Sequence, residues 1–323
     1  MQQGMRERAL NGHGQARPIR ARDRKLWKSI LANRGLYLLI LPALVYLTLF
    51  HYLPMYGIQI AFKNFQAVKG IEGSAWVGFK HFATFFDAYY CGRLITNTLL
   101  LNVLTLLFSF PVPIVLAIML NNLRNDRFKR FTQTVIYIPH FVSTVVLAGM
   151  LYIFLSPANG LINHLLASLG KDTIFFMNEA SWFRPIYIIS GIWQNAGWNS
   201  ILYIAALSGI DQELYEAATI DGASRFQKVR YIDLPHIIPT ATMMLILNCG
   251  ALMSSSTQKT LLLQTGGNIV TSDIIGTYVY TMGLGSAQYS YTAAIGLFVN
   301  VINFLMVLAA NTLSNRMKGE TLF

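Results

Sequence analysis

Long uncharged apolar runs alternate with short polar segments along this chain. A helix needs about 20 apolar residues to cross the ~30 Å hydrocarbon layer of a membrane. Stretches of that length without Lys, Arg, Asp or Glu lie at 35–56, 94–120, 132–155, 185–207, 237–256 and 291–313. Helices of a large soluble core keep a charged outer face. The pattern therefore predicts an all-α, polytopic membrane protein with six transmembrane helices.

Composition and charge agree with this prediction and give the chain an orientation. Only 12% of the 323 residues are charged, about half the share in an average soluble domain. Lys and Arg concentrate in the cytoplasmic loops of membrane proteins. With the N-terminus inside, the segments 1–34, 121–131, 208–236 and 314–323 hold 18 of the 25 basic residues. We therefore expect both termini in the cytoplasm, and membrane lipid rather than nucleic acid as the partner of the net charge of +11.

The chain divides into a basic N-terminal tail at 1–34, a first span with an external loop at 35–93, a core of five spans at 94–313 and a C-terminal tail at 314–323. The core includes a cytoplasmic loop at 208–236. In the first tail, Trp27, Ile30 and Leu31 share one side of a helix, which fits either a basic interfacial helix or a solvated tail. We expect no cleaved signal peptide, and short external helices within 57–93 and at 159–170.

The motifs of several protein classes do not occur in the sequence. It contains no G-x-x-x-x-G-K-[ST] phosphate loop and no H-E-x-x-H or Cys/His cluster for a metal. The two cysteines, Cys91 and Cys249, form neither a disulfide framework nor a metal site. The spans lack the charged residues that ion-driven carriers use. We therefore expect no catalytic residue, metal or cofactor in this chain, and an external energy source for any transport.

The 208–236 loop carries helix signals between two apolar runs. Asp211 is placed to cap the run QELYEAATI, which consists of good helix formers. Asp221 and Gly222 supply a turn that ends this helix. Ser224 and Gln227 have the spacing of a capping box for a second helical piece. The prediction is a short helix–turn–helix that lies parallel to the membrane.

The loop also contains prolines, small residues and acidic residues, each with an expected role. Pro235 is expected to break the chain after Leu234, and Pro239 to begin the fifth span, where its missing N–H is tolerated. The small residues Ala217 and Ala218 let another surface approach the backbone. The acidic residues Glu213, Glu216 and Asp221 offer ion pairs. We therefore expect a partner protein to dock here.

The run EAATIDGASRFQKVRYIDLP at 216–235 resembles the EAA loop of permease subunits of binding-protein-dependent ABC importers. The matching positions are Glu216, Ala217, Ala218, Asp221, Gly222, Ala223, Ile232, Leu234 and Pro235, while Val229 replaces a frequent Phe. The resemblance implies a type I ABC importer permease fold. It also implies that the loop forms the coupling helix of the family, which docks on the ATP-binding subunit. The coupling residues implied are Glu213, Glu216, Ala217, Ala218, Asp221, Gly222, Ala223, Leu234 and Pro235.

Several partners follow from the same resemblance. It implies a second permease subunit, a paralogue that forms a heterodimer with this chain. It also implies two ATP-binding cassette subunits, which carry the ATP and Mg, and an extracytoplasmic solute-binding protein. The expected location is the cytoplasmic (inner) membrane of a prokaryote. A membrane enzyme would need an acid/base or metal cluster, and a structural protein would need no such docking loop.

Other segments narrow the resemblance to a class of solute. The runs VIYIPHFVSTVV and TGGNIVTSDIIGTYVYTMGL are similar to carbohydrate-type permeases for oligo- and polysaccharide uptake, and nearest to those for alginate, a polyuronate. The alternative is a non-sugar solute such as a peptide or amino acid, because the EAA pattern is common to all these importers. An acidic polysaccharide favours a basic path, yet the predicted spans hold no basic residue, so the charge of the substrate stays open.

Polar and aromatic residues near the middle of the later spans are candidates for the solute path, since transporters gather such groups at the midplane. Amides and aromatic faces suit the hydroxyls and C–H faces of sugars. The alternative is that the amides bond between helices. We assign His140 to helix contacts rather than to proton transfer. The candidate path residues are Trp193, Asn195, Trp198, Asn199, Asn248, Asn300 and Asn303.

Overall fold

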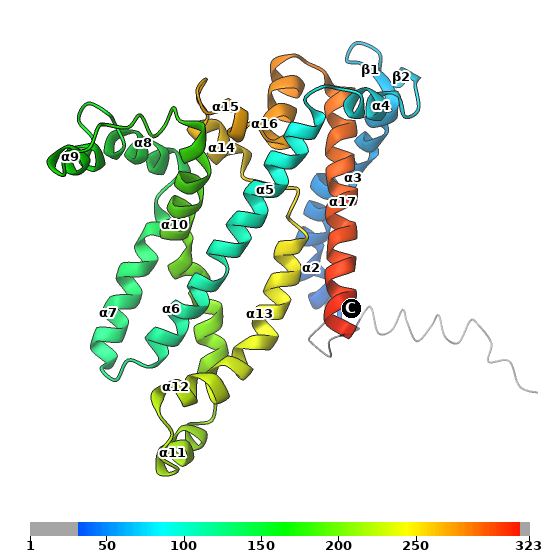
Figure 1. Ribbon diagram of the computed structural model, residues 1–323. Helices are drawn as coiled ribbons and strands as arrows, with labels where there is room; N and C mark the ends of the chain where they lie inside the picture. Colours follow the sequence, from blue (N-terminus) through cyan, green and yellow to red (C-terminus); the bar gives the residue numbers. More distant parts are fainter. Residues whose placement is uncertain (1–31, 317–323) are drawn as a thin grey trace, which may run out of the picture. The chain divides into compact units, whose positions relative to one another are not determined.

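The computed structural model describes residues 32–316 of the chain. The described residues divide into two compact units, one up to Ile58 and one from Gln59 onward, which are described separately below (Figure 1). The helix predicted around Trp27, Ile30 and Leu31 lies outside the described residues. So do the first 31 residues of the N-terminal tail and the last seven of the C-terminal tail.

The described part of the first unit is one long apolar helical run. It comprises α2 (Arg34–Leu47), the π-helical η1 (Thr48–Tyr52) and α3 (Leu53–Met55), and continues into the 3-10 helix η2 (Tyr56–Phe62). Pro42 lies inside α2 and Pro54 in the first turn of α3. The run Arg34–Phe62 has 29 residues and a mean hydropathy of 1.9, so it can cross a membrane and agrees with the span predicted at 35–56.

The second unit begins with a small β-hairpin that the sequence pattern did not predict. Strand β1 (Lys63–Gln66) pairs antiparallel with β2 (Gly70–Trp76), with a bulge between Asn64 and Gln66. The ring of Phe62 stacks on that of Trp76, with centroids 5.6 Å apart. The predicted external helix follows as α4 (Lys80–Phe86). The hairpin and α4 therefore form a structured external segment rather than a plain loop.

The second span is the bent rod of α5 (Cys91–Ser109) and α6 (Pro111–Asn121), which agrees with the run predicted at 94–120. The third predicted span, 132–155, is not a single straight helix. Helix α7 (Asp126–Tyr137) with η3 (Ile138–Phe141) meets α8 (Thr144–Phe154) at an angle of 95°. Pro139 interrupts the helix, and the Ser143 side chain caps the start of α8 by accepting from Val146 N at 3.3 Å. Helix α8 therefore turns sideways and leads to α9 (Leu161–Ser168) (Figure 1).

The fourth predicted span is α10 (Ala180–Ser208). Its 29 residues extend about 43 Å at 1.5 Å per residue, which is enough to cross a membrane. Its polar residues nevertheless keep it below the hydropathy of a typical span. Within residues 32–316, four helical runs are both long and apolar enough to span, or five with the bent pair. The predicted count of six is therefore not confirmed by these criteria.

The fifth span begins earlier than the sequence indicated. After α11 (Gln212–Ile220), one continuous helical run extends from Arg225 to Cys249 through α12 (Arg225–Lys228), the π-helical η4 (Val229–Asp233) and α13 (Leu234–Cys249). The break predicted at Leu234-Pro235 is therefore wrong, and Pro239 lies inside α13 instead of at its start. The π-helical turn before Pro235 widens the helix, which relieves the clash between a proline ring and the preceding turn.

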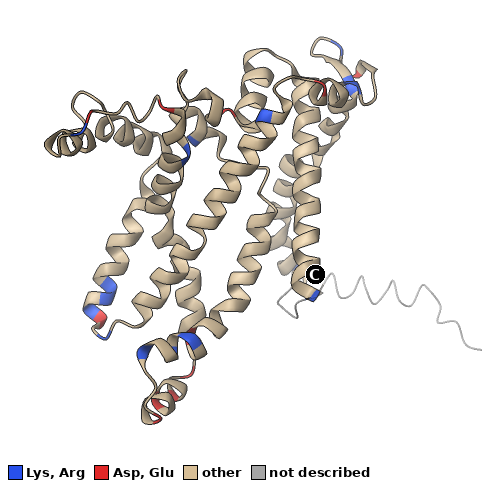
Figure 2. Ribbon diagram, viewed as in Figure 1, with Lys and Arg blue, Asp and Glu red and all other residues tan. Residues whose placement is uncertain are grey.

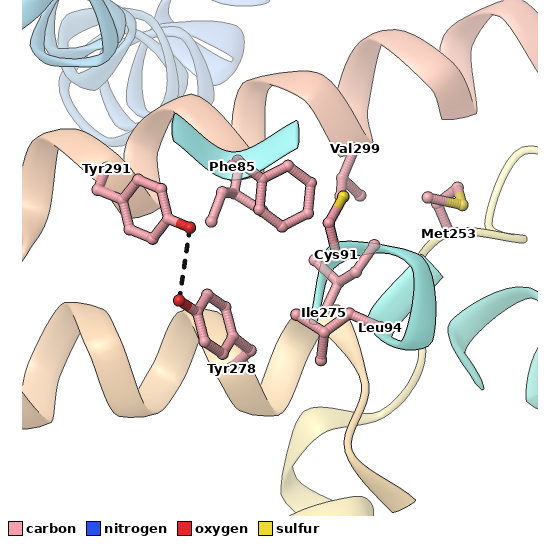
Figure 3. Close-up of a cluster of buried hydrophobic side chains, with 9 residues drawn as sticks. Phe85, Cys91, Leu94, Met253, Ile275, Tyr278, Tyr291 and Val299 are labelled. Carbon is pink, nitrogen blue, oxygen red and sulfur yellow. Dashed lines mark hydrogen bonds between the residues drawn. The ribbon is translucent and has the colours of Figure 1, made fainter. Parts of the chain in front are cut away.

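After α13, the chain re-enters the bundle before its last span. Helices α14 (Thr257–Leu263), α15 (Ile269–Ser272) and α16 (Ile275–Tyr280) lead through the π-helical η5 (Thr281–Gly285) to α17 (Tyr289–Arg316). Thr260 and Leu263 of α14 are buried. Figure 3 shows the Tyr278 and Tyr291 hydroxyls facing each other, 3.4 Å apart, in a buried cluster that joins α5, α16 and α17. The outer half of the second unit is thus held by these returning segments.

Charged residues of the second unit lie mostly toward the two ends of its helices, as Figure 2 shows. The middle of each long helix is free of them in the described part of the chain. Unpaired charges are costly within hydrocarbon. This partition is the one that the sequence pattern predicted, and it identifies the apolar middle as the membrane-embedded zone.

Helices α7 and α10 approach each other closely at Gly197. A Cβ atom at this position would lie 2.0 Å from the carbonyl oxygen of Ile136. Because that oxygen belongs to the backbone, it cannot rotate away. We expect Gly197→Ala to lower the stability of the folded protein by about 1–3 kcal/mol, measured as a lower midpoint of thermal unfolding in detergent. The control is Gly296→Ala in α17, where an added Cβ would meet no neighbouring side chain or other segment within 4 Å. Equal unfolding midpoints for the two variants would contradict the prediction.

Candidate functional site

The 208–236 loop contains the helix–turn that its sequence predicts. The Asp211 side chain caps α11 by accepting from Glu213 N at 3.0 Å. The helix ends in a Schellman motif, in which Ala223 N donates to Ala218 O at 2.9 Å and Gly222 N to Thr219 O at 3.1 Å. Gly222 has a φ of +75°, which favours glycine. Asp221 and Gly222 therefore reverse the chain as expected.

The second helical piece is capped and tied back to the first. Gln227 N donates to Ser224 Oγ at 3.3 Å, and Ser224 N donates to Gln227 Oε1 at 2.7 Å, which completes the predicted capping box. Lys228 Nζ in α12 donates to Thr219 Oγ1 in α11 at 2.6 Å. These bonds hold the loop as one compact structure that projects from the inner ends of the helices (Figure 1).

The outward side of this loop is acidic and apolar. Glu213, Glu216 and Asp221 are exposed, and Ala217 beside them is exposed as well. Two large apolar side chains of the same loop are also largely exposed to solvent. Ile220 is 87% exposed and Phe226 is 72% exposed. Exposed apolar groups within a charged rim are typical of a protein docking surface. The sequence analysis did not single out these two residues.

The base of the loop is held by a buried group of hydrogen bonds that the sequence did not reveal. The Tyr215 hydroxyl in α11 donates to Asp233 Oδ1 in η4, a carboxylate that is fully buried. Asn122 Nδ2, after α6, donates to Asp233 Oδ2 at 3.4 Å, and Asn121 Nδ2 donates to the Tyr215 oxygen at 3.3 Å. Burial raises the pKa of Tyr215, and the hydrogen bond to Asp233 raises it further. We call these four residues the latch.

A cavity of about 850 Å³ lies between α5, α6, α10 and α13. Predicted path residues Trp198, Asn199 and Asn248 line it. Its other polar lining residues, which the sequence analysis missed, come mainly from α5 and include Asn102, Thr105, Ser109, Tyr203 and Ser254. No charged residue of the described chain lines this cavity. It is therefore a neutral, mainly apolar space in which hydroxyl, amide and aromatic groups are interspersed.

The remaining predicted path residues lie elsewhere in the second unit. Trp193 lines a second, apolar cavity of about 780 Å³ between α8, α9 and α10. Asn195 Oδ1 lies 3.1 Å from His140 Nδ1, and the His140 ring stacks on Trp198 at 4.5 Å. Asn300 is exposed on α17. The structure thus brings part of the predicted set to the neutral cavity, and the His140 ring contacts α10.

Asn303 makes hydrogen bonds of a structural kind. Its Oδ1 accepts from Met253 N at 2.9 Å, and its Nδ2 donates to Ser254 Oγ at 2.8 Å. Both partners lie in the segment after α13, where the helix has ended. This geometry corresponds to the alternative of an amide that bonds between segments of a membrane bundle.

Residues 109–319 match the sequence model of the family described as "Binding-protein-dependent transport system inner membrane component". Protein LplB of Bacillus subtilis (strain 168) is 42% identical over 298 residues, which span 92% of this chain and 94% of LplB. The polygalacturonan/rhamnogalacturonan transport system permease protein YteP of the same organism is 41% identical over 300 residues, which span 93% of this chain and 94% of YteP.

Solved structures show the same similarity in three dimensions. A chain in the crystal structure of a bacterial ABC transporter involved in the import of the acidic polysaccharide alginate is 41% identical, with a TM-score of 0.84 over 90% of this chain and 99% of that chain. A second crystal structure is of a bacterial alginate ABC transporter in complex with alginate pentasaccharide-bound periplasmic protein. It contains a chain 40% identical, with a TM-score of 0.85 over 92% of this chain and 100% of that chain.

The turn at Gly222 provides a test of the loop structure. We expect Gly222→Ala to destabilise the turn by about 1–2 kcal/mol, because a Cβ is disfavoured at positive φ. The expected result is faster tryptic cleavage at Arg225 and Lys228 in the folded protein. Gly209→Ala is the matched control, since this nearby glycine has an ordinary φ of −82°. Equal cleavage rates in the two variants would show that the turn does not need its left-handed residue.

Proposed function

The chain belongs to the family of binding-protein-dependent transport system inner membrane components, and on this premise we propose that it is the permease subunit of an ATP-driven importer for an acidic oligo- or polysaccharide. The supporting observation is its similarity, over at least 90% of its length, to the permease chains of two alginate importer structures. The similarity to a permease for polygalacturonan and rhamnogalacturonan points to the same class of substrate.

The chemistry of the neutral cavity supports a sugar as the solute. The amides of Asn199 and Asn248 and the hydroxyl of Ser109 can exchange hydrogen bonds with sugar hydroxyls. The exposed face of Trp198 can cover a sugar ring. The lining offers no cation to a uronate carboxylate. In this proposal the neutral hydrogen-bond donors of the cavity, together with groups from the second permease subunit, donate hydrogen bonds to the uronate carboxylates.

The partners and the energy source complete the proposal. Two ATP-binding cassette subunits bind ATP and Mg on the cytoplasmic side, and this chain itself carries no cofactor. A second, paralogous permease forms the other half of the pathway, and an extracytoplasmic solute-binding protein delivers the sugar. A periplasmic protein is bound in one of the similar alginate transporter structures. The complex lies in the cytoplasmic membrane of a prokaryote.

The 208–236 loop couples the ATPases to the spans in this proposal. The exposed acidic residues and the small alanines of α11 contact a groove of the ATP-binding subunit, and Gly222 and Ala223 shape the turn behind them. Closure of the ATPases displaces the loop. Because the helical run from Arg225 to Cys249 is continuous through Leu234 and Pro235, that displacement reaches Asn248 at the cavity.

Charge reversal on the docking surface tests the coupling. We expect Glu216→Lys to reduce uptake by reconstituted vesicles at least tenfold, because a charge pair with the ATPase subunit becomes a repulsion of a few kcal/mol. Gly222→Pro should have the same effect, since proline cannot adopt a φ of +75°. The control is Glu179→Lys, an acidic residue at the start of α10, remote from the loop. Normal uptake and ATPase stimulation in Glu216→Lys would refute the coupling role.

Substrate class is tested with the complete importer and its binding protein in vesicles. We expect uptake of oligouronates that is blocked by excess unlabelled oligouronate and unaffected by peptides or amino acids. Asn248→Leu in the cavity should lower this uptake about fivefold, since it removes about 1 kcal/mol of hydrogen bonding. Met243→Leu, on α13 but outside the cavity lining, serves as the control. Peptide or amino-acid uptake without oligouronate uptake would overturn the substrate assignment.

A further inference from the structure

The latch connects three elements that all take part in the proposed transport cycle. Tyr215 belongs to α11, and Asp233 ends η4 at the foot of α13. Asn121 is the last residue of α6, and Asn122 caps it. Helices α6 and α13 both line the neutral cavity, through Pro113 and through Asn248 and its neighbours. The latch therefore lies between the surface that meets the ATPase and two of the cavity walls.

The covalent connection between α11 and the α12–α13 helix is short and contains a glycine. It runs through Asp221, Gly222, Ala223 and Ser224, and Gly222 has a wide range of backbone conformations open to it. Without bonds across it, a push on α11 could rotate this turn and leave α13 in place. Two hydrogen bonds bridge the turn: the exposed bond from Lys228 Nζ to Thr219 Oγ1, and the bond from Tyr215 to the buried Asp233 at the foot of α13.

The hydrogen bonds of the latch to Asp233 are strong because their acceptor is a buried carboxylate. Asp233 is fully buried, and no Lys or Arg side chain of residues 32–316 forms an ion pair with it. The carboxylate is thus stabilised by neutral donors, the Tyr215 hydroxyl and the Asn122 amide. Hydrogen bonds to a charged acceptor are about twice as strong as neutral ones. Withdrawal of Tyr215 would leave a buried charge with one amide, which is strongly unfavourable.

We propose that Tyr215 and Asp233 are positioning residues that make α11 and α13 move as one body, so that displacement of the docking surface is transmitted to the cavity. Asn121 and Asn122 include the end of α6 in the same movement. This inference rests on the proposed function, because it presupposes an ATPase that displaces α11. Neither residue needs to contact the ATPase or the solute.

The test compares uptake with ATP hydrolysis in the reconstituted importer. Tyr215→Phe and Asp233→Asn should each lower the number of solutes imported per ATP hydrolysed by roughly five- to tenfold, the factor that loss of one buried hydrogen bond produces in an equilibrium. ATPase stimulation by the loaded binding protein should persist, because the docking surface is intact. A residue with a purely structural role would lower uptake and hydrolysis together.

A double-mutant cycle and a control make the result specific. If both residues act through one bond, the double variant should have the coupling ratio of a single variant. Tyr231→Phe removes the hydroxyl of a tyrosine in the same element that is 70% exposed, and its ratio should equal that of the unsubstituted protein. Should Asp233→Asn fail to fold, Tyr215→Phe alone decides the question.

The results can refute the role of the latch without refuting the proposed function. Coupling ratios within twofold of the unsubstituted protein for Tyr215→Phe, in an importer that itself transports, would overturn the latch and leave the proposed function standing. Fully additive losses in the double variant would overturn it as well. Failure of the unsubstituted complex to couple hydrolysis to uptake would instead remove the proposed function, and the latch with it.

Discussion

Backbone hydrogen bonding inside an apolar medium governs the architecture of the second unit. In hydrocarbon every backbone N–H and C=O must find a partner within the protein, so each interruption of a helix needs a side chain that replaces the lost bond. At the bend before α8, Gln194 Nε2 donates to Val142 O at 2.7 Å. Where α13 ends, Asn102 Nδ2 donates to Leu252 O at 2.9 Å, and Asn303 accepts from Met253 N. Amides thus permit the breaks that shape the cavity.

The same requirement explains how the outer segments return into the bundle. Asn97 Nδ2 donates to the carbonyls of Val270 and Asp273 at 2.8 and 3.0 Å, which fixes α15 and the start of α16 on α5. Asn268 Nδ2 donates to Met177 O and Leu263 O, both at 2.9 Å. With their backbone groups satisfied, these short helices bury apolar side chains on α5, α10 and α17. The outer half of the second unit is thus held together by these hydrogen bonds and by its buried apolar clusters.

At the inner ends, the structure combines one rigid and one adaptable connection. The run from Arg225 to Cys249 remains helical across two prolines because the π-helical turn η4 accommodates the first. The turn at Gly222 is the adaptable part. The hydrogen bonds from Tyr215 to the buried Asp233 carboxylate and from Lys228 to Thr219 span this turn. In the proposed transport cycle, they connect the docking surface to the helix that lines the cavity.

The sequence by itself determined the membrane-embedded class, the capped helix and Schellman turn around Asp211 and Gly222, and the family resemblance carried by the 216–235 run. These features depend on local composition and on bonds between near neighbours, which residue order specifies directly. Only the tertiary structure decided the 95° bend before α8 and the continuous helix through Pro235. It alone also showed that Asn248 lines the cavity, whereas Asn303 accepts a hydrogen bond from a backbone N–H. An amide that lines a cavity and an amide that replaces a lost backbone bond are the same residue type, so only the groups that lie opposite them in the folded chain distinguish them.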